Sequence, residues 1–271
     1  MKKFFRYKIK SKALTTVLML AIPVAALMLM ESYTHVPWDL TPPIFFLNLV
    51  GYYLIYLLGT FLFGGVAGGY TFATLLFMCC GLADYCVVCF RSSPIVPWDI
   101  YSIRTAVSVA DNYNIDITGK LIGVVLGFLT LTVLGRVLPG KVKKLRIRLA
   151  GLALSICCVF GYVKAVGSDA VIETVGLDTT LFTPNVLYRN NGLLAGFAGN
   201  IRFMKVEKPE GYSTKAAEEI AQSYQTQETT TAKKDLPNII VIMNEAFSDL
   251  SVFGDFHVSE DYMPFIHSLD K

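Results

Sequence analysis

The chain has 271 residues, of which 54% are hydrophobic and only 17% are charged. Its mean hydropathy is +0.51, whereas a soluble globular domain carries about 25% charged residues. This composition excludes an ordinary soluble domain and predicts that lipid covers part of the chain. The net charge of +3 is small, so the distribution of charge along the chain is more informative than its sum.

Five apolar stretches are long enough to cross a bilayer, because about 20 helical residues span its hydrocarbon core. They cover residues 13–30, 44–63, 66–90, 121–138 and 149–166. We therefore predict a transmembrane helical domain over residues 1–166. Gly64 and Gly65 predict a tight turn between the second and third helices. A cleaved signal peptide explains the first stretch poorly, since Glu31 and Tyr33 follow it in place of a small-residue cleavage site.

Two clusters of basic residues adjoin the predicted spans, and neither contains an acidic residue. Their members are Lys2, Lys3, Arg6, Lys8, Lys10 and Lys12, and then Arg136, Lys141, Lys143, Lys144, Arg146 and Arg148. Lys and Arg are enriched in cytoplasmic loops, so both clusters predict the cytoplasmic side of a cell membrane. Nucleic-acid binding is not expected. Five crossings then place the residues after about 167 outside the cell.

Polar residues are rare inside the predicted spans. Asp84 is the acid that lies within one, and intramembrane acids are candidates for function. It sits near the outer end of its helix, so we interpret it as structural rather than as a transport residue. All six cysteines lie in apolar stretches, and Cys86 and Cys89 have no second pair at zinc spacing, which favours packing roles. His35, in the first outer loop, has no evident partner in the sequence.

The composition becomes polar after the fifth span, and residues 167–236 predict an extracellular connecting segment. A turn is expected at residues 190–192. Ser213 is a suitable cap for a short helix over residues 214–225, which has one apolar face. Residues 226–236 are polar, rich in Thr and without periodicity, which indicates a linker.

A new domain is predicted over residues 237–271. Residues 238–243 form a short, mostly β-branched apolar run without alternation, which is typical of a strand buried on both faces of an α/β sheet. Glu245 follows it, at the strand end that borders the ligand crevice in such sheets. Its carboxylate could bind Mn²⁺ or Mg²⁺ through oxygen, although an acid after a buried strand is more often a helix cap or loop residue.

Four stretches in this order resemble the lipoteichoic acid synthase family of Gram-positive bacteria. They are RSSPIVPWD at 91–99, YRNNG at 188–192, KPEGY at 208–212 and PNIIVIMNEAFSDL at 237–250. Members of that family are membrane-anchored transferases that move glycerophosphate from phosphatidylglycerol to a growing polymer on a lipid anchor. Their extracellular catalytic domain has an α/β alkaline-phosphatase or sulfatase-like fold. The resemblance extends over essentially the whole chain, and the last stretch is its most specific part.

The resemblance implies that Glu245 is a metal ligand, for Mn²⁺ or Mg²⁺. It also implies a nucleophilic Thr and further Asp and His ligands at later positions, which no residue up to Lys271 matches. We therefore assign no catalytic residue and expect this chain alone to be inactive. Other candidates match no family position and are interpreted as cap, linker, surface or packing residues: Thr231, Ser248, Ser251, His257 and His267.

Three alternatives remain open at this point. Two share the fold, namely a membrane-anchored phosphoethanolamine transferase and a sulfatase. The third is a membrane-bound interaction module without catalytic activity.

Overall fold

The structure is a computed structural model that describes residues 8–102, 116–205, 208–209, 211–223, 254 and 258–268. The chain divides into two compact units, Met1–Glu207 and Lys208–Lys271. The first unit contains the five helices that are long and apolar enough to cross a membrane, as predicted. They are α1 (Lys12–Glu31), α2 (Pro42–Leu62), α3 (Val66–Arg91), α5 (Gly119–Val137) and α6 (Leu145–Val166).

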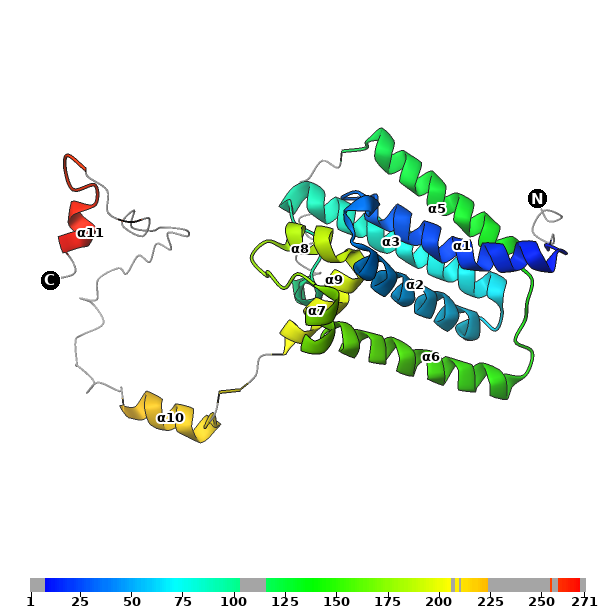
Figure 1. Cartoon of the computed structure of the whole chain (residues 1–271). Coiled ribbons are helices and arrows are strands. Elements are labelled where there is room, and N and C mark those ends of the chain that lie inside the picture. Colours follow the sequence, from blue (N-terminus) through cyan, green and yellow to red (C-terminus); the bar gives the residue numbers. More distant parts are fainter. Residues whose placement is uncertain are drawn as a thin grey trace, which may run out of the picture. The chain divides into compact units, whose positions relative to one another are not determined.

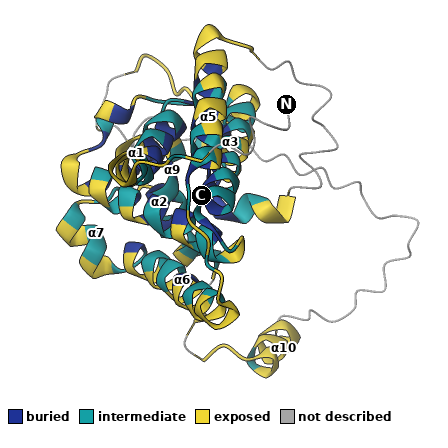
Figure 2. Ribbon diagram, turned by 90° about the vertical axis from the view of Figure 1, so that its right-hand side faces the viewer, coloured by how far each residue is buried: buried dark blue, intermediate teal, exposed yellow. Residues whose placement is uncertain are grey.

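The five helices form one bundle (Figure 1). α3 packs against α2 and α5, while α1 contacts all three of them and α6 packs on α2. The outward faces of the helices carry exposed apolar side chains such as Val17, Phe46, Leu126 and Phe160, and Figure 2 shows exposed residues along α5 and α6. A soluble protein buries such surface, whereas a bilayer covers it.

Pro23 interrupts the hydrogen bonding of α1. A proline has no N–H, so the carbonyl oxygen of Met19, four residues earlier, loses its helical donor. The hydroxyl of Tyr70 on α3 donates to this oxygen at 2.9 Å, and the hydroxyl of Tyr53 on α2 donates to the carbonyl oxygen of Leu20 at 2.7 Å. The Tyr70 hydroxyl thus replaces the donor that Pro23 removes, where hydrocarbon could not solvate the carbonyl.

Small residues bring α2 and α3 together at the tight turn that the sequence predicts. Gly64 adopts a φ of +67° in this turn. A Cβ atom on Gly69 would lie 2.2 Å from the backbone nitrogen of Thr60, so no side chain fits there. Further along, the rings of Tyr52 and Phe77 stack with centroids 4.2 Å apart.

α6 begins at Leu145, ahead of the predicted start at residue 149. The side chain of Arg148 explains the extension, since its Nε donates to the carbonyl oxygen of Phe61 at 2.9 Å and its guanidinium also donates to that of Leu62. Both carbonyls belong to the last turn of α2, where helical donors run out, and that of Phe61 also accepts from the Gly64 N–H at 3.3 Å. A cation at a helix C-terminus is also favourable for the helix dipole.

The first compact unit extends beyond the predicted end of the helical domain at residue 166. Residues 167–205 form α7 (Asp169–Val175), α8 (Pro184–Asn191), α9 (Leu193–Asn200) and the 3-10 turn η5 (Ile201–Met204). α9 packs against α2 and α6. Part of the predicted connecting segment is therefore built into the end of the bundle.

The second unit contains α10 (Thr214–Ser223) and α11 (Pro264–Ser268). The Ser213 hydroxyl accepts a hydrogen bond from the Ala216 N–H at 3.0 Å, which confirms the predicted cap. No β-strand occurs within the described ranges. The predicted strand at 238–243 and the linker at 226–236 lie outside them, so the α/β sulfatase-like domain stays a prediction.

Candidate functional site

The residues predicted to carry metal chemistry are not among those that the structure describes. Glu245 lies outside them, as do Thr231, Ser248, Ser251 and His257. His267 is described, and its Nδ1 lies 2.8 Å from a carboxylate oxygen of Asp261. Within the described ranges, no group of three or more His, Cys, Asp or Glu side chains could hold a metal ion.

The two ends of the bundle differ in charge. One end gathers the start of α1, the α2–α3 turn, the end of α5 and the start of α6, where the N–H of Val66 donates to the carbonyl of Gly140 at 3.1 Å. Its described charged residues are all basic, and every acidic residue described between 8 and 205 belongs to the opposite end. The two basic clusters of the sequence therefore meet at one end, and the polar structures below lie at the other.

The stretch 91–99 folds into a closed loop after α3. The guanidinium of Arg91 donates to both carboxylate oxygens of Asp99, at 2.8 and 2.7 Å. Partial burial acts to raise the pKa of Asp99, but the hydrogen bonds from Arg91 and from the Val96 N–H outweigh it and hold that pKa below its usual value. Asp84 fastens the loop to α3, since its Oδ1 accepts from the Ile95 N–H at 2.7 Å.

Asp84 therefore anchors the loop, as the structural interpretation predicts, but only one of its two carboxylate oxygens accepts a hydrogen bond. The residue is 3% exposed. Its second oxygen, Oδ2, is buried without a hydrogen-bond partner in the described structure.

Of the predicted turn at 190–192, Asn190 and Asn191 form the end of α8, and Gly192 alone, at φ +77°, joins α8 to α9. Asn48 of α2 is fully buried beside it, and its Nδ2 donates to the carbonyl oxygen of Asn191 at 2.7 Å. The Asn48 Oδ1 accepts from the N–H of Ala195 at 2.9 Å. Asn48 therefore binds both sides of the turn and satisfies one of the free N–H groups that open α9.

Glu31, the last residue of α1, satisfies another of those groups. Its side chain is fully buried, and Oε1 accepts from the N–H of Leu193 at 2.9 Å. A carboxylate is well placed at a helix N-terminus because the helix dipole is positive there. α9 thus begins with no cap of its own, and side chains from α1 and α2 supply its acceptors.

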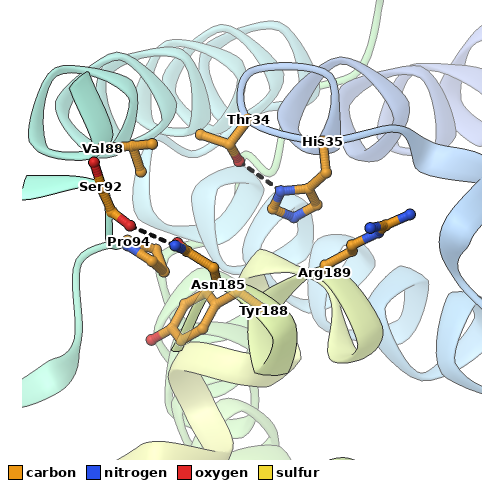
Figure 3. A pocket seen from close by; sticks show the side chains of 8 residues that line it. All are labelled: Thr34, His35, Val88, Ser92, Pro94, Asn185, Tyr188 and Arg189. Atoms are coloured by element: carbon orange, nitrogen blue, oxygen red, sulfur yellow. Dashed lines mark hydrogen bonds between the residues drawn. The ribbon is translucent and has the colours of Figure 1, made fainter. Parts of the chain in front are cut away.

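A pocket of about 340 Å³ opens between α8, the end of α3 and the loop after α1; polar side chains stand among its largely apolar walls, and we call it the polar pocket. Thr34 and His35 line one side, and Asn185, Tyr188 and Arg189 of α8 line the other (Figure 3). The remaining walls come from Val88, Ser92 and Pro94. The side chain of Asn185 donates to the carbonyl of Ser92, which fixes α8 to the loop after α3.

Two cationic or ionisable side chains border this pocket. The Nδ1 of His35 lies 2.7 Å from the Thr34 hydroxyl, and its Nε2 lies 3.2 Å from Glu31 Oε2. Arg189 donates through Nε to Asp39 at 2.7 Å. Burial raises the pKa of the hydroxyl of Tyr188, which also lines the pocket, so this group is neutral at physiological pH.

The roles of three residues in this region were not predicted from the sequence. His35 does have a partner, Glu31, and the signal was their spacing of four residues, which is one helical turn. Glu31 was predicted to lie in the loop after the first span, but it is the last residue of α1. Asn48 was detectable as a lone strongly polar side chain in an apolar span, a feature that indicates a buried partner.

Comparison with known proteins finds a distant relative. The chain is 25% identical over 189 residues to a protein of Rhizobium meliloti (strain 1021) named for the modification of cyclic beta-1,2-glucan. The similarity covers 66% of this chain but only 29% of that protein. No protein-family model matches the chain, and no solved structure is significantly similar to it. The chain is thus a multi-pass helical protein that is distantly similar to part of a longer glucan-modification protein.

Proposed function

We propose that the chain is the membrane-embedded part of an enzyme that transfers glycerophosphate from phosphatidylglycerol to an acceptor outside the cell. The observation that carries this proposal is the polar pocket bordered by His35 and Arg189 at the acid-containing end of the bundle. A phosphate head group that binds at this end of the bundle needs hydrogen-bond donors from the protein. Arg189 uses Nε for Asp39, so the rest of its guanidinium remains available for phosphate.

The orientation follows from the charge of the other end. The basic residues gathered around Lys8, Lys141 and Arg148 favour the cytoplasmic side. With the N-terminus inside, α8, α9 and the polar pocket face outward. The second unit, Lys208–Lys271, then lies outside the cell as well.

Two candidate acceptors of the glycerophosphate follow from the similarities of the chain. The resemblance to lipoteichoic acid synthases points to a growing polymer on a lipid anchor. The name of the Rhizobium relative points instead to a soluble glucan. Since the chain spans 29% of that relative's length, we propose the activity for a longer protein that contains these residues.

Metal dependence is part of the proposal through Glu245. A divalent cation such as Mn²⁺ or Mg²⁺ would polarise the phosphate and activate a hydroxyl nucleophile. Glu245 is the proposed ligand from this chain. The nucleophilic Thr and the other ligands implied by the resemblance have no counterpart here.

The test uses the longer protein in phosphatidylglycerol vesicles with Mn²⁺. We expect release of diacylglycerol and labelling of one acceptor, either a lipid-anchored glycerophosphate polymer or cyclic beta-1,2-glucan. Glu245→Ala should abolish Mn²⁺-dependent release without affecting membrane insertion. Glu260→Ala, at an exposed acid of the same unit, is the matched control and should retain full activity.

Four results would contradict the proposal. Full activity of Glu245→Ala would remove that residue from the metal site. Diacylglycerol release from phosphatidylethanolamine alone would identify a phosphoethanolamine transferase, and hydrolysis of sulfate esters would identify a sulfatase. Absence of any lipid turnover by the longer protein would favour a non-catalytic interaction module.

A further inference from the structure

A second cavity, of about 380 Å³, lies beside the polar pocket. Its lining is almost entirely apolar and comes from α1, α2, α3 and α9, together with Ile95 and Tyr188. Tyr188 also lines the polar pocket, so it borders both cavities. Both volumes fall within the roughly 300–1,000 Å³ typical of small-molecule sites.

The cavity reaches the surface of the bundle along α3. Leu76, Cys80 and Ala83 line it, recur at helical spacing on one face of that helix and are exposed. α3 is one of the helices apolar enough to cross the membrane. In a bilayer, this opening would therefore face lipid.

Three residues that line the cavity, Tyr52, Asp84 and Tyr188, each have a buried polar atom without a hydrogen-bond partner among the described residues. These atoms are the hydroxyls of Tyr52 and Tyr188 and Oδ2 of Asp84. Tyr52 is 0% and Asp84 is 3% exposed. A buried polar group left unpaired costs about 1–3 kcal/mol, so such groups indicate a ligand that pairs with them.

We propose that this cavity binds one ester-linked acyl chain of a glycerolipid from the surrounding bilayer. The hydrocarbon chain fits the apolar lining. An ester carbonyl of the lipid accepts a hydrogen bond from the Tyr52 hydroxyl, which a hydrocarbon could not do. The head group of the same lipid then lies in the polar pocket.

The inference rests on the proposed function only where it assigns the polar pocket and the second cavity to one lipid. Lipid binding by the cavity can be measured without any turnover. The adjacent residues Cys79 and Cys80 provide a matched pair of variants. Both are exposed on α3, but only Cys80 lines the cavity. Cys80→Trp fills the cavity, while Cys79→Trp adds the same side chain outside it.

The first experiment measures lipid retained by the purified 271-residue chain, using native mass spectrometry in detergent with added dioleoyl phosphatidylglycerol. Wild type and Cys79→Trp should retain lipid, and Cys80→Trp should lose at least tenfold in affinity. Circular dichroism establishes that each variant is folded. Equal retention by the two Trp variants would overturn the proposal.

The second experiment tests the ester contact with a variant that keeps the ring. Wild type should bind the diester lipid roughly threefold to tenfold more tightly than a diether lipid of the same chain length, the effect of about one hydrogen bond. Tyr52→Phe keeps the stacking on Phe77 and should abolish that preference. An unchanged preference in Tyr52→Phe would refute the assigned hydrogen bond.

Activity of the longer protein separates this inference from the proposed function. If Cys80→Trp loses both retained lipid and transfer, the cavity holds the donor. If it loses retained lipid but keeps transfer, the cavity holds a resident lipid, and the inference still stands. Lipid binding without any transfer by wild type would refute the proposed function alone.

Discussion

The carboxylate of Glu31, at the end of α1, accepts a hydrogen bond from the backbone N–H of Leu193, the first residue of α9, at 2.9 Å. This contact joins residues 162 positions apart in the chain. It makes the C-terminal end of a membrane helix the cap of a short helix that borders the candidate site. The charge that would be unfavourable in hydrocarbon is thereby fixed at the positive end of a helix.

Removal of this cap should destabilise the bundle. Glu31→Ala leaves the Leu193 N–H buried without an acceptor, so we expect it to lower the free energy of unfolding by about 1–3 kcal/mol. Glu31→Gln retains an oxygen acceptor and should cost less. Thermal unfolding in detergent measures both, and equal stability of Glu31→Ala and wild type would show that the cap is unimportant.

The turn at Gly192 should not tolerate a side chain. Its φ of +77° and ψ of 155° are accessible essentially to glycine alone, and a Cβ atom would lie 2.8 Å from Nδ2 of Asn48. Gly192→Ala should therefore lower the free energy of unfolding by roughly 2–4 kcal/mol. Gly176→Ala is the control for a positive φ with open space around it; its ψ of 44° places Gly176 in the left-handed helical region, so part of any difference reflects the backbone at Gly192. Similar losses for both variants would exclude the contact with Asn48 as a cause.

The Tyr70 hydroxyl and Pro23 should be energetically coupled. Tyr70→Phe leaves the Met19 carbonyl without a donor in wild type, and we expect a loss of about 1–2 kcal/mol. In a Pro23→Ala background, the introduced alanine would supply the missing N–H, so the same substitution should cost less. A double-mutant cycle from unfolding measurements gives the coupling, and a coupling of zero would contradict this role of Tyr70.

The loop at 91–99 should make stability dependent on pH. The folded pKa of Asp99 lies below its unfolded value, so the folded state binds fewer protons at this site. Its contribution is therefore complete above the unfolded pKa of about 3.9 and is lost as the pH falls through the lower folded value. Asp99→Asn should reduce the slope of melting temperature against pH below about pH 4. An identical pH profile for the variant would exclude Asp99.

The charge difference between the ends predicts the topology. Alkaline phosphatase is active only when exported, so a fusion after residue 142 should be inactive and one after residue 180 active. A further fusion after residue 36 tests the first outer loop and should be active. The reverse pattern would invert the orientation and place the polar pocket inside the cell.

The sequence by itself determined the five membrane helices and the separation of basic residues. Hydrophobic length depends only on local composition, which explains why each predicted span has a matching helix in the structure. The Gly64–Gly65 turn and the Ser213 cap were predictable for the same reason, since turns and caps depend on neighbouring residues.

Only the tertiary structure decided where the candidate site lies. The partners of Glu31 and Asn48 are backbone N–H groups more than a hundred residues away, and no periodicity encodes which helix end meets which side chain. The YRNNG stretch resembles a simple turn in sequence, yet Asn191 and Gly192 fit against Asn48 because α8 and α9 fold back onto α2. A bilayer cannot hydrogen-bond to these groups, so the bundle must provide each partner itself, and that requirement places residues 167–205 against the membrane helices.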